Sequence, residues 1–169
     1  MSQLKLRSGV RGVLALASLL VLAACSALSG FGDRTSALAD VPDLQFYSSD
    51  EAVAKAKVHF KERNYGHAAS FYKRAVEVAP NDPDALTGLA ASYDRLHRFD
   101  LADRVYAALY KAEGGTLSYY NNVGYSYLLR GDLQRARASF LKAYDLDPEN
   151  VVVANNLQLL GGSDRVIAR

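Results

Sequence analysis

Residues 49–150 divide into three segments of equal length with no gaps between them. The segments cover residues 49–82, 83–116 and 117–150, so their starting points are evenly spaced along the chain. Self-similarity at a fixed period of this size is typical of repeat architectures, in which each unit buries its apolar face against the next one. The period therefore predicts an all-α array of stacked units between residues 49 and 150.

Small and aromatic residues recur at fixed places in the three segments. Aromatic residues stand at the twenty-fourth place, and small residues at the eighth and twentieth are Ala56, Ala90, Gly124, Ala68, Ala102 and Ala136. A small residue opposite a large ring allows two antiparallel helices to pack closely. We expect these six residues to form the contacts between helices.

This pattern resembles the tetratricopeptide repeat (TPR), in which each unit is a helix–turn–helix pair. The resemblance implies three such pairs and a TPR domain over residues 49–160. After the third repeat, residues 151–160 look like the start of another first helix and predict a capping helix that ends at Gly161 and Gly162. Residues 161–169 are then expected to be a short C-terminal tail.

The segment of residues 1–24 has the features of a secretory signal. Three basic residues precede an apolar run of about a dozen residues, which is too short to span a bilayer. The run ends in Leu22-Ala23-Ala24-Cys25, which resembles the lipobox of bacterial lipoproteins. That resemblance implies cleavage after Ala24, lipid on Cys25 and a flexible tether over residues 25–48 that could fold back at its end through Leu44, Phe46 and Tyr47.

The alternative is that Cys25 is a buried core residue in an uncleaved apolar helix. Ser26 follows the cysteine, and by resemblance to Gram-negative lipoproteins the absence of Asp there favours the outer membrane, facing the periplasm. The expected signal holds three of the 20 basic residues and none of the 18 acidic ones, so the rest has a net charge of −1. A chain of that charge has no basic patch for nucleic acid.

No pattern in the sequence predicts catalysis, a metal, a cofactor or a small-molecule substrate. His59, His67 and His97 have no helical ligand spacing, and Cys25 has no second cysteine to complete a zinc site. For His59 we expect a packed or hydrogen-bonded role. Nucleophile elbows, phosphate loops and zinc-protease motifs are absent from the sequence.

The TPR resemblance implies a concave groove lined by the first helix of each pair. The residues expected to bind a protein there are Lys57, Lys61, Arg95, Asn121, Asn122, Tyr125, Leu128 and Asn156, with Asp94 beside them. The chaperone-binding subclass grips a peptide carboxylate through fixed basic and amide positions, but here Val53, Gly88 and Ser118 occupy three of them.

Two features of this expected groove suggest how a partner would bind. Asn122 and Asn156 share a repeat position, so they could hold an extended peptide backbone by their amides; the alternative is ordinary polar surface. Lys57 and Lys61 are better suited to steering an acidic segment than to gripping it. A partner segment is therefore expected at the C-terminal half of the groove.

A lipobox, a tether, three repeats and a cap together resemble small repeat lipoproteins of pilus and secretion machines. The Tad (Flp) pilus lipoprotein and the type IV pilus pilotins are examples. The leading hypothesis is a non-enzymatic scaffold that binds a secretin or another assembly component. The alternatives are a periplasmic adaptor for peptidoglycan enzymes and an envelope hydrolase with an unrecognised site.

Overall fold

The computed structural model describes residues 38–167, with side chains described up to Gly161. The expected signal, Cys25 and the tether up to residue 37 lie outside this range. The described residues belong to one compact unit that begins at Leu38. They contain one 3-10 helix, η1 (Leu44–Phe46), seven α-helices and no strand.

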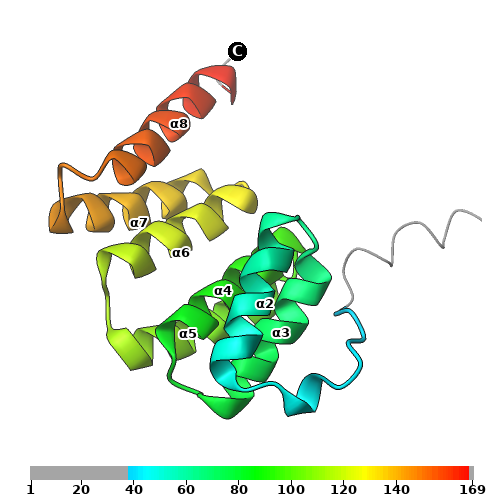
Figure 1. The fold of residues 1–169 in the computed structure, drawn as a ribbon. Helices are drawn as coiled ribbons and strands as arrows, with labels where there is room; N and C mark the ends of the chain where they lie inside the picture. The colour runs from blue at the N-terminus through cyan, green and yellow to red at the C-terminus, as the bar shows by residue number, and fades with distance from the viewer. Residues whose placement is uncertain (1–37, 168–169) are drawn as a thin grey trace, which may run out of the picture. The chain divides into compact units, whose positions relative to one another are not determined.

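The seven α-helices of the described range follow the predicted repeats closely (Figure 1). Repeat one forms α2 (Ser49–Lys61) and α3 (Tyr65–Val78), and repeat two forms α4 (Pro83–Arg95) and α5 (Phe99–Glu113). Repeat three forms α6 (Leu117–Leu129) and α7 (Leu133–Leu146), and α8 (Val151–Ile167) follows. The all-α prediction and the three helical pairs are confirmed.

Local side-chain chemistry explains where the first helices begin. Ser48 and Glu51 form the capping box of α2, in which each side chain binds the backbone N–H of the other residue. Asp82 caps α4 with Pro83 in the first turn, and Thr116 caps α6 through the N–H of Tyr119. The three caps occupy equivalent places just before each first helix, which is why the helix register follows the sequence period.

The turn within each pair has the same backbone conformation in all three repeats. Arg63, His97 and Gly131 occupy the same repeat position and have φ angles of 63°, 57° and 76°. This left-handed region is favourable for glycine and strained for other residues. The repeat geometry therefore imposes the turn, even where the residue at that place is an arginine or a histidine.

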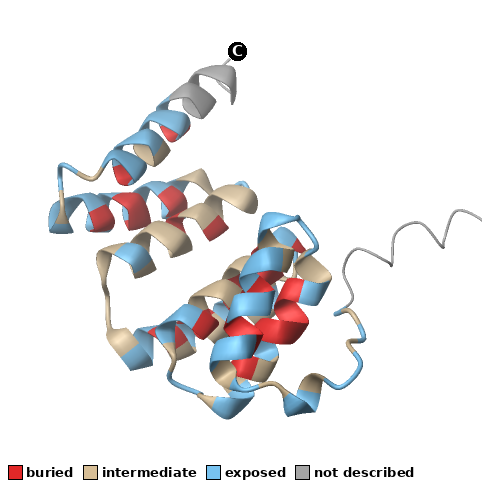
Figure 2. Cartoon of the chain, in the orientation of Figure 1, coloured by how far each residue is buried: buried red, intermediate tan, exposed pale blue. Residues whose placement is uncertain are grey.

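The apolar core has two parts (Figure 2). The larger one is built from α2 to α5, with Tyr119 and Val123 of α6 packed against it. The smaller one is centred on Ala136, Phe140 and Leu160, with side chains of α6 around it. Repeats one and two thus share one cluster, whereas the buried residues of the second cluster come from α7 and α8.

The six small residues predicted for the helix contacts are all buried. The five alanines, Ala56, Ala68, Ala90, Ala102 and Ala136, have no exposed surface. A Cβ on Gly124 would lie 2.6 Å from the ring of Phe140, so only glycine fits there without movement. The burial of the six small residues and the contact of Gly124 with the Phe140 ring agree with the predicted packing of small residues against large rings.

Two of the expected boundaries differ from the structure. α8 continues through Gly161 and Gly162 to Ile167, past its expected end. A glycine weakens a helix by about 1 kcal/mol but ends it only where the backbone turns, and Gly161 does not have a positive φ. The chain from Leu38 to Tyr47 is not a free tether, because it packs on repeat one.

The segment of residues 38–47 lies against α3. Ser70 donates a hydrogen bond of 2.6 Å to the carbonyl of Ala39, and Arg74 donates to the carbonyls of Gln45 and Tyr47. The Tyr47 ring meets the edge of Phe71 at 5.4 Å. Leu44 and Tyr47 therefore fold back as expected, but Phe46 does not, because 77% of its surface is exposed.

Candidate functional site

The first helices of the repeats lie next to one another. α4 contacts both α2 and α6, and α8 is joined to α6 by a hydrogen bond between side chains. Their solvent-facing side chains at the repeat positions expected for the groove form what we call the first-helix surface. All eight predicted binding residues lie on these four helices.

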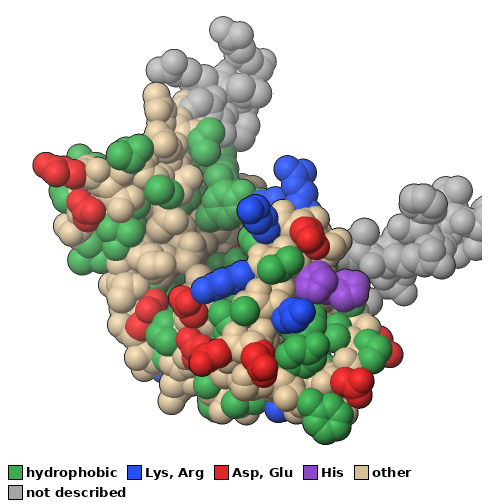
Figure 3. Space-filling view, in the orientation of Figure 1, with side chains coloured by type: hydrophobic (Ala, Val, Ile, Leu, Met, Phe, Trp, Pro, Cys, Tyr) green, Lys and Arg blue, Asp and Glu red, His purple; other side chains and the backbone are tan. Residues whose placement is uncertain are grey.

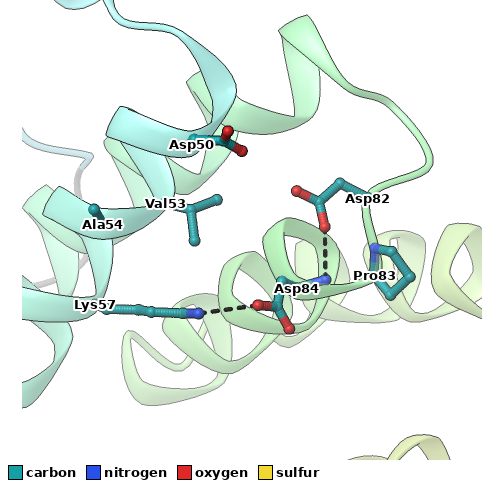
Figure 4. A pocket seen from close by; sticks show the side chains of 7 residues that line it. All are labelled: Asp50, Val53, Ala54, Lys57, Asp82, Pro83 and Asp84. Carbon is teal, nitrogen blue, oxygen red and sulfur yellow. Dashed lines mark hydrogen bonds and ion pairs between the residues drawn. The ribbon is translucent and has the colours of Figure 1, made fainter.

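The α2–α4 end of the first-helix surface contains a pocket of about 540 Å³ (Figure 4). Asp50, Asp82, Asp84 and Lys57 bring three carboxylates and one ammonium to its lining, beside Val53, Ala54 and Pro83. The Nζ atom of Lys57 lies 2.9 Å from a carboxylate oxygen of Asp84. Lys57 is thus paired with an acid of its own chain, although both side chains are more than half exposed. Steering of an acidic segment by Lys57 stays a prediction.

Arg95 lies between two tyrosines in the middle of the surface. Its Nη2 donates a 2.9 Å hydrogen bond to the hydroxyl of Tyr65, and its Nη1 a 3.3 Å bond to that of Tyr125. The guanidinium also lies 5.1 Å from the centre of the Tyr65 ring, which in turn meets Phe60 edge-on. This places two of the predicted binding residues, Arg95 and Tyr125, in contact and adds Tyr65 from α3.

The asparagines of the C-terminal half pair differently from the expected ladder. Asn156 donates a 2.8 Å hydrogen bond to the side chain of Asn121, and Asn122 points its amide at Ser118 of its own helix. Tyr125 and Leu128 are half-buried against the smaller core. The polar strip across α6 and α8 is therefore centred on the Asn121–Asn156 pair.

Asp94 was expected to face the groove, and that expectation is wrong. Its carboxylate is 2% exposed and accepts hydrogen bonds from Ser126 at 2.6 Å and from Tyr106 at 2.9 Å. Arg130 lies 3.9 Å away and forms a two-pronged ion pair with Asp103. The residue turns inward because these groups of α5 and α6 satisfy its charge.

Burial dominates the ionisation of this cluster. It raises the pKa of Asp94, although the hydrogen bonds from Ser126 and Tyr106 and the charge of Arg130 oppose the shift. Burial also raises the pKa of Tyr106 well above its usual value, and the neighbouring Asp94 carboxylate adds to that shift. Through these contacts the cluster joins repeats two and three.

The structure brings together two histidines that the sequence pattern did not connect. The rings of His59 and His67 stack at 5.1 Å, and His59 also stacks on Phe71 at 5.4 Å. A packed role for His59 was expected, but its pairing with His67 follows only from the antiparallel packing of α2 and α3. Among residues 38–167, no three His, Cys, Asp or Glu side chains form a group that could hold a metal ion.

The three positions that lack the carboxylate-gripping residues differ in their surroundings. Val53 is buried, and Ser118 is exposed but holds only a hydroxyl. At Gly88 a Cβ would lie 2.1 Å from the ring of Tyr72, so the space that a gripping side chain needs is filled by that ring. These three positions therefore supply none of the basic or amide groups with which the chaperone-binding subclass grips a peptide carboxylate.

On the face shown in Figure 3, charge is distributed unevenly. Acidic and basic side chains mix over the part formed by α2 to α5, whereas hydrophobic and uncharged side chains predominate over α6 to α8. Val151, Val152 and Leu159 of α8 are all more than half exposed. Within the described range, no helix is both long and apolar enough to span a bilayer.

Comparison with known proteins agrees with this architecture. Residues 53–102 and residues 118–150 match two models that both describe the tetratricopeptide repeat. The chain carries tetratricopeptide repeats. Such repeats form scaffolds for interaction with other proteins, and the family part of the sequence-based identification is confirmed.

Curated relatives share the repeats but are much longer proteins. A small glutamine-rich TPR-containing protein 2 of Mycosarcoma maydis is 28% identical over 116 residues, which are 64% of this chain and 33% of the relative. RNA polymerase II-associated protein 3 of Rattus norvegicus is 27% identical over 62% of this chain and 16% of its own length. The chain thus spans a third or less of these proteins.

Solved structures share the fold at low sequence identity. The first TPR of Spaghetti (RPAP3), bound to the HSP90 peptide SRMEEVD, superposes with a TM-score of 0.60 at 21% identity, over 68% of this chain and 91% of that one. The Yersinia enterocolitica type III secretion chaperone SycD, in complex with a peptide of the translocator YopD, has a TM-score of 0.57 at 16% identity, over 68% and 93%. At these identities the likeness establishes the fold alone.

Proposed function

We propose that the chain is a non-enzymatic scaffold that binds a segment of a partner protein on its first-helix surface. The observation that carries this proposal is the Asn121–Asn156 pair, which joins α6 to α8 beside the exposed Val152. An amide group has two donor hydrogens and an acceptor oxygen, so one mutual bond leaves donors and acceptors for a peptide backbone. The apolar side chain next to it offers contact area for a partner's side chain.

The comparisons support a peptide as the partner. The solved structures of the RPAP3 and SycD complexes contain peptides bound to domains of the same fold. The positions at which the chaperone-binding subclass grips a peptide carboxylate hold Val53, Gly88 and Ser118 in this chain. Binding would depend instead on amides and apolar contacts of repeat three and α8.

We further propose that Cys25 carries lipid and holds the domain at the periplasmic face of the outer membrane, where it assists assembly of a Tad-type pilus or a related secretion machine. The lipobox and the signal-like segment support this placement. A single acyl chain binds membranes only marginally, so a lipoprotein anchor with several chains would be required. Cys25→Ser should leave the protein uncleaved or released into the soluble periplasm, and wild-type recovery of that variant in outer membranes would refute the anchor.

The binding surface is tested by capture from solubilised membranes, followed by mass spectrometry. The double variant Asn121→Ala/Asn156→Ala should lose the partner, because unmet buried polar groups cost about 1–3 kcal/mol each. Asn64→Ala/Asn81→Ala, which changes two asparagines outside the first-helix surface, is the matched control, and circular dichroism establishes that all variants fold. Unchanged capture by the first variant would place binding elsewhere, and recovery of peptidoglycan enzymes without a secretin would contradict the pilus assignment.

A further inference from the structure

Arg95 differs from the arginine of the cluster between repeats two and three. Arg130 is neutralised by Asp103 through two short hydrogen bonds. For Arg95 the structure gives two hydrogen bonds to tyrosine hydroxyls and no carboxylate oxygen within 4.0 Å among the described residues. Its positive charge is therefore held in place by neutral groups and not compensated by them.

The surroundings of Arg95 fix its direction. The guanidinium spans the hydroxyls of Tyr65 and Tyr125, which come from α3 and α6, and it lies over the Tyr65 ring. A guanidinium has five donor hydrogens in a planar fork, and these contacts use two of them. The rest stay available on an exposed residue in a fixed orientation.

The helix dipole accounts for only part of this arrangement. Arg95 is the last residue of α4, where a cation is favourable, and Lys61 occupies the equivalent place at the end of α2. Lys61 can interact favourably with the C-terminal end of its helix without hydrogen bonds to tyrosines, so that interaction alone does not explain the tyrosines around Arg95. The two hydroxyls and the aromatic face around Arg95 point to a second role, since a pre-positioned guanidinium loses less entropy when it binds an anion.

We infer that Arg95 is the anchor for an Asp or Glu side chain of the partner segment. The neighbouring Phe60, Tyr65 and Tyr125 rings and Leu128 then contact an apolar side chain next to that acid, and Lys61 adds a second positive charge on the same side. This inference rests on the proposed function and specifies the partner's chemistry: an acidic segment with adjacent apolar residues. It places the acid near the C-terminal ends of α2 and α4, away from the carboxylate-lined pocket of Asp50, Asp82 and Asp84.

The inference is tested with a phage-displayed library of random peptides that have no free C-terminal carboxylate. The library is selected on the full chain and on Arg95→Gln, with Arg104→Gln as a control that removes the same charge from the exposed face of α5. We expect wild type and Arg104→Gln to enrich peptides with Asp or Glu beside aliphatic or aromatic residues. Arg95→Gln should lose this enrichment.

The selected peptide then gives a quantitative answer by fluorescence anisotropy. Replacing its Asp and Glu by Asn and Gln, or Arg95 by Gln, should each weaken binding by about ten- to a hundredfold, as expected for hydrogen bonds between charged groups. Arg95→Lys keeps the charge without the planar fork and should give an intermediate loss. Tyr65→Phe/Tyr125→Phe leaves the charge in place but removes both acceptors, so a several-fold loss would reveal the positioning even if Arg95→Gln proved unstable.

Two results would overturn the inference in different ways. Enrichment of basic or uncharged peptides that lose binding in Asn121→Ala/Asn156→Ala would refute the acidic partner and leave the first-helix surface in place. Peptides unaffected by Arg95→Gln and by the asparagine pair, or no selected peptide at all, would refute both the anchor and the proposed binding surface.

Discussion

The hydroxyl of Ser126 donates a 2.6 Å hydrogen bond to the buried carboxylate of Asp94, 32 residues earlier in the chain. The two residues lie in different repeats, on α6 and α4. The same hydroxyl accepts a hydrogen bond from Arg130 at 2.8 Å. Ser126 therefore links the carboxylate of Asp94 to the guanidinium of Arg130. The junction between repeats two and three thus depends on polar contacts as well as apolar ones.

Ser126→Ala should destabilise the protein by about 1–3 kcal/mol, because it leaves the buried Asp94 carboxylate without one of its donors. The measurement is the free energy of unfolding from urea titration followed by circular dichroism. Ser118→Ala, at an exposed position of the same helix, is the control and should have little effect. Equal losses in the two variants would mean that the junction does not depend on this bond.

Adding a methyl group should distinguish crowded glycines from open ones. Gly88→Ala and Gly124→Ala would push against the rings of Tyr72 and Phe140, and overpacking of this kind costs about 1–3 kcal/mol. A Cβ on Gly161 meets no atom within 4 Å, so Gly161→Ala should be neutral or stabilising in α8. The melting temperatures should separate accordingly, and a loss at Gly161 like that at Gly124 would contradict the packing.

The sequence predicted the helices well because its period and its caps carry the same information. Helix starts at Ser49, Pro83 and Leu117 coincide with the starts of the three repeats. The surroundings of a side chain that occurs in only one repeat were harder to predict, because they depend on neighbours from other helices. Asp94 turns inward only because Tyr106 and Ser126 meet it there, and no periodicity encodes that pair.

The predicted binding residues were placed on the right helices, but their partners could not be read from spacing alone. Asn156 donates its hydrogen bond to Asn121 and not to Asn122, which holds the same repeat position as Asn156. The side chains that meet between α6 and α8 therefore do not hold equivalent repeat positions. Tyr65, which fixes Arg95, belongs to a second helix and so was absent from a list built on first helices. A search for aromatic residues at the start of each second helix could have found it.

The left-handed turns predict a stabilising substitution. Arg63 has a φ of 63°, which costs an L-residue with a side chain about 1–2 kcal/mol relative to glycine. Part of that gain is lost because glycine is more flexible in the unfolded chain, so Arg63→Gly should stabilise by up to about 1 kcal/mol. The opposite change in repeat three, Gly131→Ala at a φ of 76°, should destabilise by a similar amount. Urea unfolding would contradict this view if both changes had the same sign.

Stability should fall at alkaline pH in a way that depends on Tyr72. Burial, aided by the charge of Asp84, raises the pKa of Tyr72 to about 12 from 10.0. The unfolded phenol loses its proton first, so stability is intact below pH 10 and is lost as the pH rises from there through about 12. Tyr72→Phe should flatten the slope of unfolding free energy against pH in that window, whereas Tyr144→Phe, at an exposed position, should not. An identical slope in wild type and Tyr72→Phe would contradict the prediction.

The segment before α2 should detach when its aromatic contact is removed. The Tyr47 ring packs edge-on against Phe71, whereas the neighbouring Phe46 is 77% exposed. Tyr47→Ala should therefore speed proteolytic cleavage within residues 38–47, because the docked segment must leave α3 before a protease can bind it. Cleavage is followed by mass spectrometry under native conditions.

Phe46→Ala is the matched control, since it removes an aromatic ring from the adjacent residue without losing a packed contact. Arg74→Ala should act like Tyr47→Ala, because Arg74 holds the carbonyls of Gln45 and Tyr47 from α3. If Tyr47→Ala and Arg74→Ala were cut at the wild-type rate, residues 38–47 would not be held on α3 by these contacts.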